Sequence, residues 1–359
     1  MSLSKRGSRL VACISLFAFA AFSLCCSPNG GGTGGGSTKL QGAGATFPTP
    51  LYQKWLSEYG KLHSDILIDY QSIGSGGGIK QIREQTVDFG ASDAPMTDAE
   101  LKAAPGELVH IPTVLGAVVV TYNVASITQP LHLSSDVVAD IFLGKITKWN
   151  DARIKQDNGG VNLPAADITT VHRADASGTS FVFTDYLAKV SAEWKEKVGA
   201  DKAPKWPGGQ AGKGNEGVTG QIKQQPNTIG YVELAYATQN KLPVALIKNA
   251  SGKFIAPSID AVTAAAAAAS GETPDDLRVS ITNSAGENAY PISSYTYILA
   301  YKDQKDAGKG KALVDFLWWG IHDGEQYAKA LEYAPLPAEI VKRTEAKINS
   351  ITSGGKPLR

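Results

Sequence analysis

The sequence predicts an α/β protein of two lobes, in which each lobe is an open sheet flanked by helices and a hinge joins the two. Three observations support this fold class. The 359 residues are enough for two domains, β-type runs alternate with helical patterns after residue 38, and no internal repeat interrupts the alternation. Because ligands of open α/β sheets bind beyond the carboxyl ends of strands, the strand ends are the places to search for function.

Residues 1–25 have the form of a secretory signal peptide. Lys5, Arg6 and Arg9 precede an apolar run over residues 10–24, which is too short for a confident membrane span. We therefore expect an exported protein. Removing this segment leaves 32 basic and 34 acidic residues, and this near-neutral balance gives no support for nucleic-acid binding.

All three cysteines, Cys13, Cys25 and Cys26, lie within or directly after the signal peptide, so the exported chain cannot form a disulfide framework. The segment around Cys25 and Cys26 resembles a bacterial lipoprotein processing site. We expect the lipid on Cys26, with Cys25 as the alternative. A plain cleaved signal with incidental cysteines is the competing interpretation.

Residues 26–38 are rich in Gly, Ser and Thr and predict a flexible tether, because such a segment cannot bury a core. About ten residues of this composition span on the order of 20 Å as a coil. The folded body should begin near residue 39. Its composition, 43% apolar and 19% charged over the whole chain, is typical of a soluble globular protein rather than a disordered one.

The richest group of polar residues lies at a strand-to-helix junction over residues 172–186. Ser177, Gly178 and Thr179 stand where the helix should begin, so hydroxyls and unpaired backbone N–H groups meet at the positive end of the helix dipole. Such a position attracts an anion. Arg173 offers a fork of donors, and Asp175 could hold its guanidinium in place. The competing interpretation is an ordinary capped helix with a surface ion pair.

Three further junctions have the same form. Thr46 and Phe47 lie in a Gly-rich turn before a helix, and Ser75 begins a Gly run before a helix expected from residue 79. The Gly run is not a nucleotide P-loop, because no Gly-Lys-Ser/Thr follows it. Asp93 lies in a further segment of this form, over residues 87–95. A carboxylate among anion-binding junctions has to accept a proton from its guest, unless Asp93 is simply a turn residue before Pro95.

Six motifs occur in order from about Leu40 to the end of the chain. They are Gly42-Ala-Gly-Ala-Thr46-Phe47-Pro, Gly74-Ser75-Gly-Gly-Gly, Asp88-Phe-Gly-Ala-Ser-Asp93-Ala-Pro, Leu143-Gly-Lys-Ile-Thr-Lys-Trp149, Arg173-Ala-Asp175-Ala-Ser177-Gly178-Thr179-Ser-Phe and Ile229-Gly-Tyr-Val-Glu233. Together they resemble the periplasmic phosphate-binding proteins of bacterial phosphate-specific ABC transporters. Gly76, Ala176 and His172 depart from residues common in that family, which leaves specificity little in doubt, although affinity could differ.

The resemblance implies a two-lobed periplasmic-binding-protein type II fold that closes on inorganic phosphate. Lobe I would comprise residues 39–113 and 292–359, and lobe II residues 114–291. The family's phosphate-binding positions match Thr46, Phe47, Ser75 and Asp93 on one lobe and Arg173, Ser177, Gly178 and Thr179 on the other, with Asp175 pairing Arg173. It also implies a monomer without metal or cofactor that is lipid-anchored, faces the periplasm or cell exterior, and delivers phosphate to transmembrane permease subunits.

The chemistry of the residues agrees with a phosphate site. Phosphate near neutral pH carries a proton that it can donate to Asp93, whereas sulfate carries none and would set two acceptors against each other. This argues against sulfate or molybdate as the guest. A phosphate-ester hydrolase is the main alternative from another class, but there is no Gly-x-Ser-x-Gly elbow and the five histidines are scattered. A surface sensor or adhesin is the third alternative.

Overall fold

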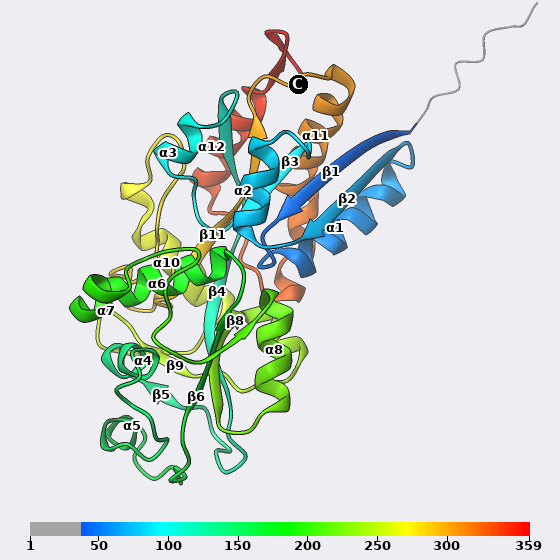
Figure 1. Cartoon of the computed structure of the whole chain (residues 1–359). Helices are drawn as coiled ribbons and strands as arrows, with labels where there is room; N and C mark the ends of the chain where they lie inside the picture. The colour runs from blue at the N-terminus through cyan, green and yellow to red at the C-terminus, as the bar shows by residue number, and fades with distance from the viewer. Residues whose placement is uncertain (1–36) are drawn as a thin grey trace, which may run out of the picture. The chain divides into compact units, whose positions relative to one another are not determined.

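The computed structural model describes residues 37–359, and it confirms an α/β fold in which helices flank a mixed sheet (Figure 1). The predicted signal peptide, the lipidation candidates Cys25 and Cys26, and the tether up to residue 36 lie outside the described residues. Thr38, which we expected at the end of the tether, is the first residue of strand β1. Its N–H donates to the carbonyl of Asp65 at 2.8 Å.

One sheet of eight strands organises the described body, in the order β2-β1-β3-β11-β4-β8-β6-β7. The strands are β1 (Thr38–Gly44), β2 (Ile66–Ser72), β3 (Phe89–Ser92), β4 (Leu108–Asn123), β6 (Thr169–Arg173), β7 (Gln210–Gly212), β8 (Thr228–Glu233) and β11 (Ser293–Tyr301). We call β2, β1, β3 and β11 with their helices the β1 side, and β8, β6 and β7 with theirs the β8 side. The two open sheets that the sequence predicts are thus continuous in the structure.

The long strand β4 provides this continuity. It pairs with β11 from Leu108 to Ala117 and with β8 from Val118 to Asn123. Its residues are buried from Leu108 to Tyr122, because the strand is covered on both faces, as its nearly unbroken apolar run predicts. In Figure 1, β4 runs from the upper part of the body, among β1, β3 and β11, into the lower part beside β8.

Helices cover both parts of the sheet (Figure 1). The α-helices are α1 (Thr49–Leu62), α2 (Ser75–Arg83), α3 (Asp98–Lys102), α4 (Ser135–Phe142), α5 (Ala152–Asp157), α6 (Gly178–Val190), α7 (Ala192–Lys197), α8 (Gly214–Gln224), α9 (Leu234–Gln239), α10 (Ile259–Ala268), α11 (Ala307–Gly320) and α12 (Ala338–Asn349). Short strands β5 (His132–Leu133), β9 (Leu246–Lys248) and β10 (Phe254–Ile255) form a second sheet, and β12 (Thr352–Ser353) pairs with β13 (Lys356–Pro357). Single 3₁₀ turns occur at Ser270–Glu272, Asp323–Tyr327 and Lys329–Leu331.

Helix α2 begins earlier than the sequence predicts. It starts at Ser75 rather than at residue 79, so the glycines that follow Ser75 form its first turn and not a flexible loop. The reason is close packing on the sheet. A Cβ atom at Gly78 would lie 2.6 Å from the carbonyl oxygen of Ala43 and 2.7 Å from that of Ala91, so only glycine allows the helix to approach the ends of β1 and β3.

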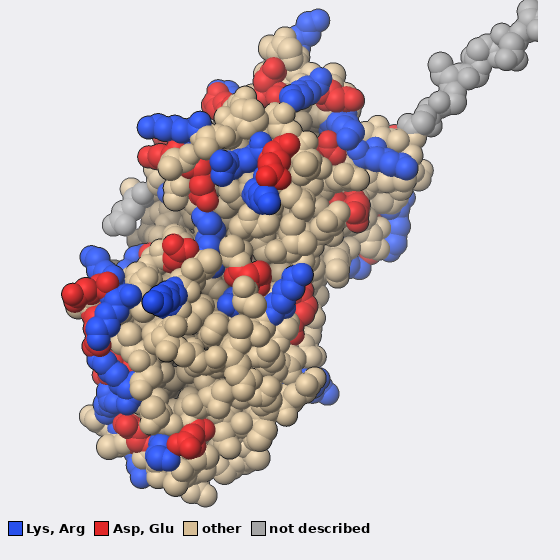
Figure 2. Space-filling model, viewed as in Figure 1, with Lys and Arg blue, Asp and Glu red and all other residues tan. Residues whose placement is uncertain are grey.

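Within residues 37–359, every helix is too short or too polar to cross a bilayer. Basic and acidic side chains are interspersed on the face of the described body seen in Figure 2, and neither sign forms a continuous patch there.

Candidate functional site

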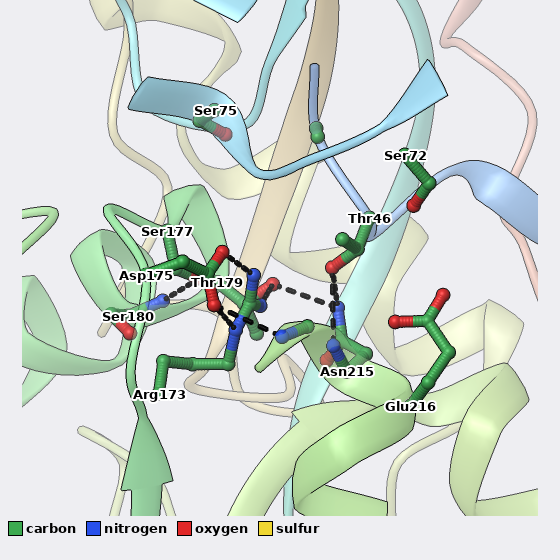
Figure 3. A network of polar contacts seen from close by, with 12 residues as sticks. Thr46, Ser72, Ser75, Arg173, Asp175, Ser177, Thr179, Ser180, Asn215 and Glu216 are labelled. Carbon is green, nitrogen blue, oxygen red and sulfur yellow. Dashed lines mark hydrogen bonds and ion pairs between the residues drawn. The ribbon is translucent and has the colours of Figure 1, made fainter. Parts of the chain in front are cut away.

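The polar residues of three predicted junctions meet beside β4, between the β1 side and the β8 side (Figure 3), and Asp93 of the fourth junction contacts Ser75. The backbone N–H of Asp93 donates to Ser75 Oγ at 3.2 Å, and the side chain of Asn215 donates to both Thr46 Oγ1 at 2.7 Å and Thr179 Oγ1 at 3.1 Å. The Ser75, Thr46 and Thr179 side chains are at most 2% exposed. These residues therefore form one buried cluster and do not belong to separate pockets.

The amino terminus of α6 supplies backbone donors to this cluster. Ser177 caps the helix by accepting from the N–H of Ser180 at 3.0 Å. Helix geometry leaves the N–H groups of Gly178 and Thr179 without an intrahelical partner, at the positive end of the dipole. A Cβ atom at Gly178 would lie 2.3 Å from Ser75 Oγ and 2.5 Å from Asp93 Oδ2, so only glycine lets the helix end approach the β1 side.

Arg173 is the cation of the site, and it is held rigidly. Its side chain is 1% exposed, its Nε donates to Asp175 Oδ1 at 2.9 Å, and its Nη2 pairs with the second carboxylate oxygen. The backbone of Gly214 also donates to Asp175 at 3.0 Å. Burial alone would raise the pKa of Asp175, but the bonds and charge of Arg173 lower it below its usual value. The pair therefore joins a buried arginine to a partly buried aspartate, and the interpretation as a surface ion pair is wrong.

Asp93 is the acid of the site, and its environment is the opposite. It is 1% exposed, and burial raises its pKa to about 7, although a hydrogen bond from Thr296 and the charge of Arg173 partly oppose the rise. Thr296 donates to Oδ1 at 2.8 Å, whereas Oδ2 has no hydrogen-bond partner within residues 37–359. The buried Oδ2 is thus free to accept a proton or a hydrogen bond from a guest.

The hydroxyl groups of the site are all arranged as donors. Thr46, Ser75, Ser177 and Thr179 each accept a hydrogen bond from an N–H group, which can only donate. Each hydroxyl therefore keeps its own hydrogen for another acceptor. With the free N–H groups of α6, they form a wall of donors facing one carboxyl oxygen, which suits a small oxyanion that carries a proton.

The side chains of Phe47 and His172 are held by packing contacts. The ring of Phe47 is fully buried, and its carbonyl accepts from the hydroxyl of Tyr333 at 2.6 Å, so Phe47 can offer a ligand only its backbone. His172 lies on β6 and its ring stacks on Trp206, with the ring centroids 4.9 Å apart.

Sequence reasoning missed several residues that complete the site. Asn215 lies in the first turn of α8, in a Gly-rich segment that carries no clear sequence signal of a ligand site. Tyr236 and Tyr333 donate to the carbonyls of Thr46 and Phe47, each at 2.6 Å. Thr296 lies in β11 between Tyr295 and Tyr297, and its sequence context gave no signal of a role in the site. Among residues 37–359, no group of three His, Cys, Asp or Glu side chains could hold a metal ion.

Comparisons with known proteins agree on one group. The model of the PBP superfamily domain matches residues 29–318. The phosphate-binding protein PstS of Xylella fastidiosa strain 9a5c is 47% identical over 311 residues, covering 86% of this chain and 85% of that protein. PstS of Pasteurella multocida is 47% identical over 322 residues, covering 89% and 93%. The crystal structure of a phosphate-binding protein from Stenotrophomonas maltophilia superposes with a TM-score of 0.69 at 23% identity, covering 86% and 94%.

Proposed function

Because the chain belongs to the PBP superfamily and, within it, to the family of PstS phosphate-binding proteins, we propose that it binds inorganic phosphate outside the cytoplasmic membrane and delivers it to the permease of an ABC transporter. The chain is a solute-binding protein and not an enzyme. The observation that carries the choice of guest is Asp93 Oδ2, a buried acceptor without a partner among the described residues, facing a wall of donors.

Phosphate fits this arrangement better than other oxyanions. At neutral pH it carries at least one proton, which it donates to Asp93, while its remaining oxygens accept from the hydroxyl and N–H groups. Sulfate has no proton to donate, so its oxygens would meet an acceptor, and a buried mismatch of this kind costs several kcal/mol. A single carboxyl therefore separates two anions of nearly the same shape.

The proposed phosphate ligands come from both sides of the sheet. They are Thr46, Phe47, Ser75 and Asp93 from the β1 side, and Arg173, Ser177, Gly178 and Thr179 from the β8 side, with Asp175 orienting Arg173. We propose that the β1 side corresponds to lobe I, residues 39–113 and 292–359, and the β8 side to lobe II, residues 114–291. The change of partner of β4 between Ala117 and Val118, and the bond from the Val118 N–H to the Ile292 carbonyl at 2.8 Å, support a hinge near these boundaries.

The proposal includes export and anchoring. Residues 1–25 act as the signal peptide, Cys26 or Cys25 carries the lipid, and the Gly/Ser-rich segment lets the monomeric binding body reach the permease. Mass spectrometry of the protein purified from bacterial membranes tests the anchor. A diacylglyceryl group on the amino-terminal cysteine supports it, and a soluble product cleaved elsewhere contradicts it.

Calorimetric titration of the purified protein, freed of bound anion, tests the binding function. We expect one phosphate per chain and no measurable heat with sulfate. A chain that binds sulfate as well as phosphate contradicts the proposed selectivity. Saturable release of phosphate from a phosphate ester, absent with heat-denatured protein, would favour a hydrolase instead.

A further inference from the structure

The side chain of Asn215 joins hydroxyls from the two sides of the sheet. It lies in the first turn of α8 on the β8 side and is fully buried. Its Nδ2 donates to Thr46 Oγ1 of the β1 side at 2.7 Å and to Thr179 Oγ1 of the β8 side at 3.1 Å (Figure 3). Neither the mechanism above nor the family comparison gives this amide a role.

The orientation of the amide follows from its third contact. The backbone N–H of Glu233, at the end of β8, lies 3.0 Å from Asn215 Oδ1. Because an N–H group can only donate, the oxygen of the amide has to face Glu233 and the nitrogen has to face the two threonines. The two hydrogens on Nδ2 are then used once each, one on each hydroxyl oxygen.

Both hydroxyl oxygens receive a second N–H donor. The backbone N–H of Asn215 lies 3.3 Å from Thr46 Oγ1, and Arg173 Nη1 lies 3.4 Å from Thr179 Oγ1. A hydroxyl oxygen has two lone pairs and one hydrogen. With both lone pairs occupied by N–H donors, each threonine can make a further bond only by donating its own hydrogen.

We propose that Asn215 is a positioning residue that fixes the hydroxyls of Thr46 and Thr179 as donors to the bound anion. This inference rests on the proposed phosphate function. Because Thr46 belongs to the β1 side and Asn215 to the β8 side, the bond also forms only when the two sides meet. Asn215 therefore fixes the hydroxyl of Thr46 as a donor only when the β1 side and the β8 side are in contact.

A double-mutant cycle measured by phosphate calorimetry tests the proposal. We expect Asn215→Ala to weaken phosphate binding about 10- to 100-fold in the wild-type background, since two donors lose their fixed direction. In the Thr46→Val and Thr179→Val double variant, which has no hydroxyls to orient, the same change should cost less than about threefold. Equal losses in the two backgrounds would mean that Asn215 only maintains the local structure, and would overturn the proposal.

A matched control is Asn249→Ala. Asn249 is another buried asparagine of the chain, and its Nδ2 contacts the carbonyls of Gly286, Glu287 and Ala289 away from the site. This variant should keep wild-type phosphate affinity. If Asn215→Ala does not fold, as judged by thermal melting, the cycle is run with Asn215→Ser, whose single hydroxyl cannot supply both hydrogens. Wild-type protein that fails to bind phosphate would refute the proposed function. If the wild type binds phosphate but the Asn215 substitution costs the same affinity in both backgrounds, only this inference is refuted.

Discussion

Two aspartates of the site, Asp93 on the β1 side and the partly buried Asp175 on the β8 side, show how differently the fold can treat the same side chain. Asp175 faces Arg173, whose bonds and charge hold its pKa below the usual value. Asp93 receives one hydroxyl bond on Oδ1 and none on Oδ2 among the described residues, and burial raises its pKa to about 7. Asp93 is fully buried whereas Asp175 is only partly buried, so the depth of burial and the partner together set the pKa of each carboxyl.

The comparison also explains how the site can hold an anion. The Arg173–Asp175 pair is close to neutral as a unit, so it contributes directed N–H donors rather than a large net charge. The helix terminus of α6 and the hydroxyls add further donors without charge. Asp93 Oδ2 is a buried acceptor without a hydrogen-bond partner within residues 37–359, and the proposed selectivity depends on it.

The largest predicted effect comes from removing the cation that distinguishes the two acids. Arg173→Ala removes a buried side chain and leaves the partly buried Asp175 without its partner, which should lower the free energy of unfolding by about 3 kcal/mol and abolish measurable phosphate binding. Denaturant unfolding and calorimetry measure the two losses. Adding Asp175→Asn to Arg173→Ala should restore much of the stability but not the binding. Full stability in the single variant would contradict the burial of this pair.

A pH titration of stability tests the state of Asp93. Its folded pKa of about 7 lies above the usual 3.8, so between these values the folded state holds a proton that the unfolded state has lost. The stability of the phosphate-free protein should therefore fall by roughly 4 kcal/mol from this group as the pH rises from about 4 to 7, and change little above. Asp93→Asn should remove this pH dependence. The free energy of unfolding of the variant, measured in urea, should therefore increase relative to that of the wild type as the pH rises from about 4 to 7. A constant difference between the two proteins at all pH values would contradict the raised pKa.

The smallest predicted effect concerns the tyrosines that hold the turn at Thr46 and Phe47. Tyr236→Phe and Tyr333→Phe each remove a hydroxyl that donates to a buried backbone carbonyl at 2.6 Å. Each change should lower the free energy of unfolding by about 1 kcal/mol. It should also weaken phosphate binding about three- to tenfold, because the turn that carries Thr46 and Phe47 loses a hydrogen bond that holds it. Stopped-flow measurements should show the loss as faster phosphate release. Unchanged release in both variants would show that the turn holds its position without them.

The strand-to-helix junctions were predictable from sequence because their signals are local. A β-type run, a Ser, Thr or Gly turn and an apolar helical face occur within about fifteen residues of each other around Ser177, and the structure brings the four junctions together. The role of Gly78 was not predictable from the sequence, because it depends on the close approach of Ala43 and Ala91, which lie on other strands.

The supporting residues could not be predicted because their contacts span the chain. Thr296 reaches Asp93 from a position 203 residues away, next to a register shift in the pairing of β11 with β4. Asn215 reaches Thr46 across 169 residues. Neither residue carries a local pattern that separates it from an ordinary turn or strand residue, so their meeting depends on the register and packing of the whole sheet.

The most direct test of the central claim is the affinity of Asp93→Asn for phosphate and sulfate, measured by calorimetry alongside the wild type at about pH 8.5, where Asp93, with its pKa of about 7, is ionised and can only accept. Asparagine keeps the size of the side chain but can donate as well as accept, so it no longer requires a proton on the anion. The account predicts that the wild type binds phosphate alone and that the variant binds both anions with affinities within about tenfold of each other. A variant that still excludes sulfate would contradict the claim that this carboxyl selects the guest by its proton.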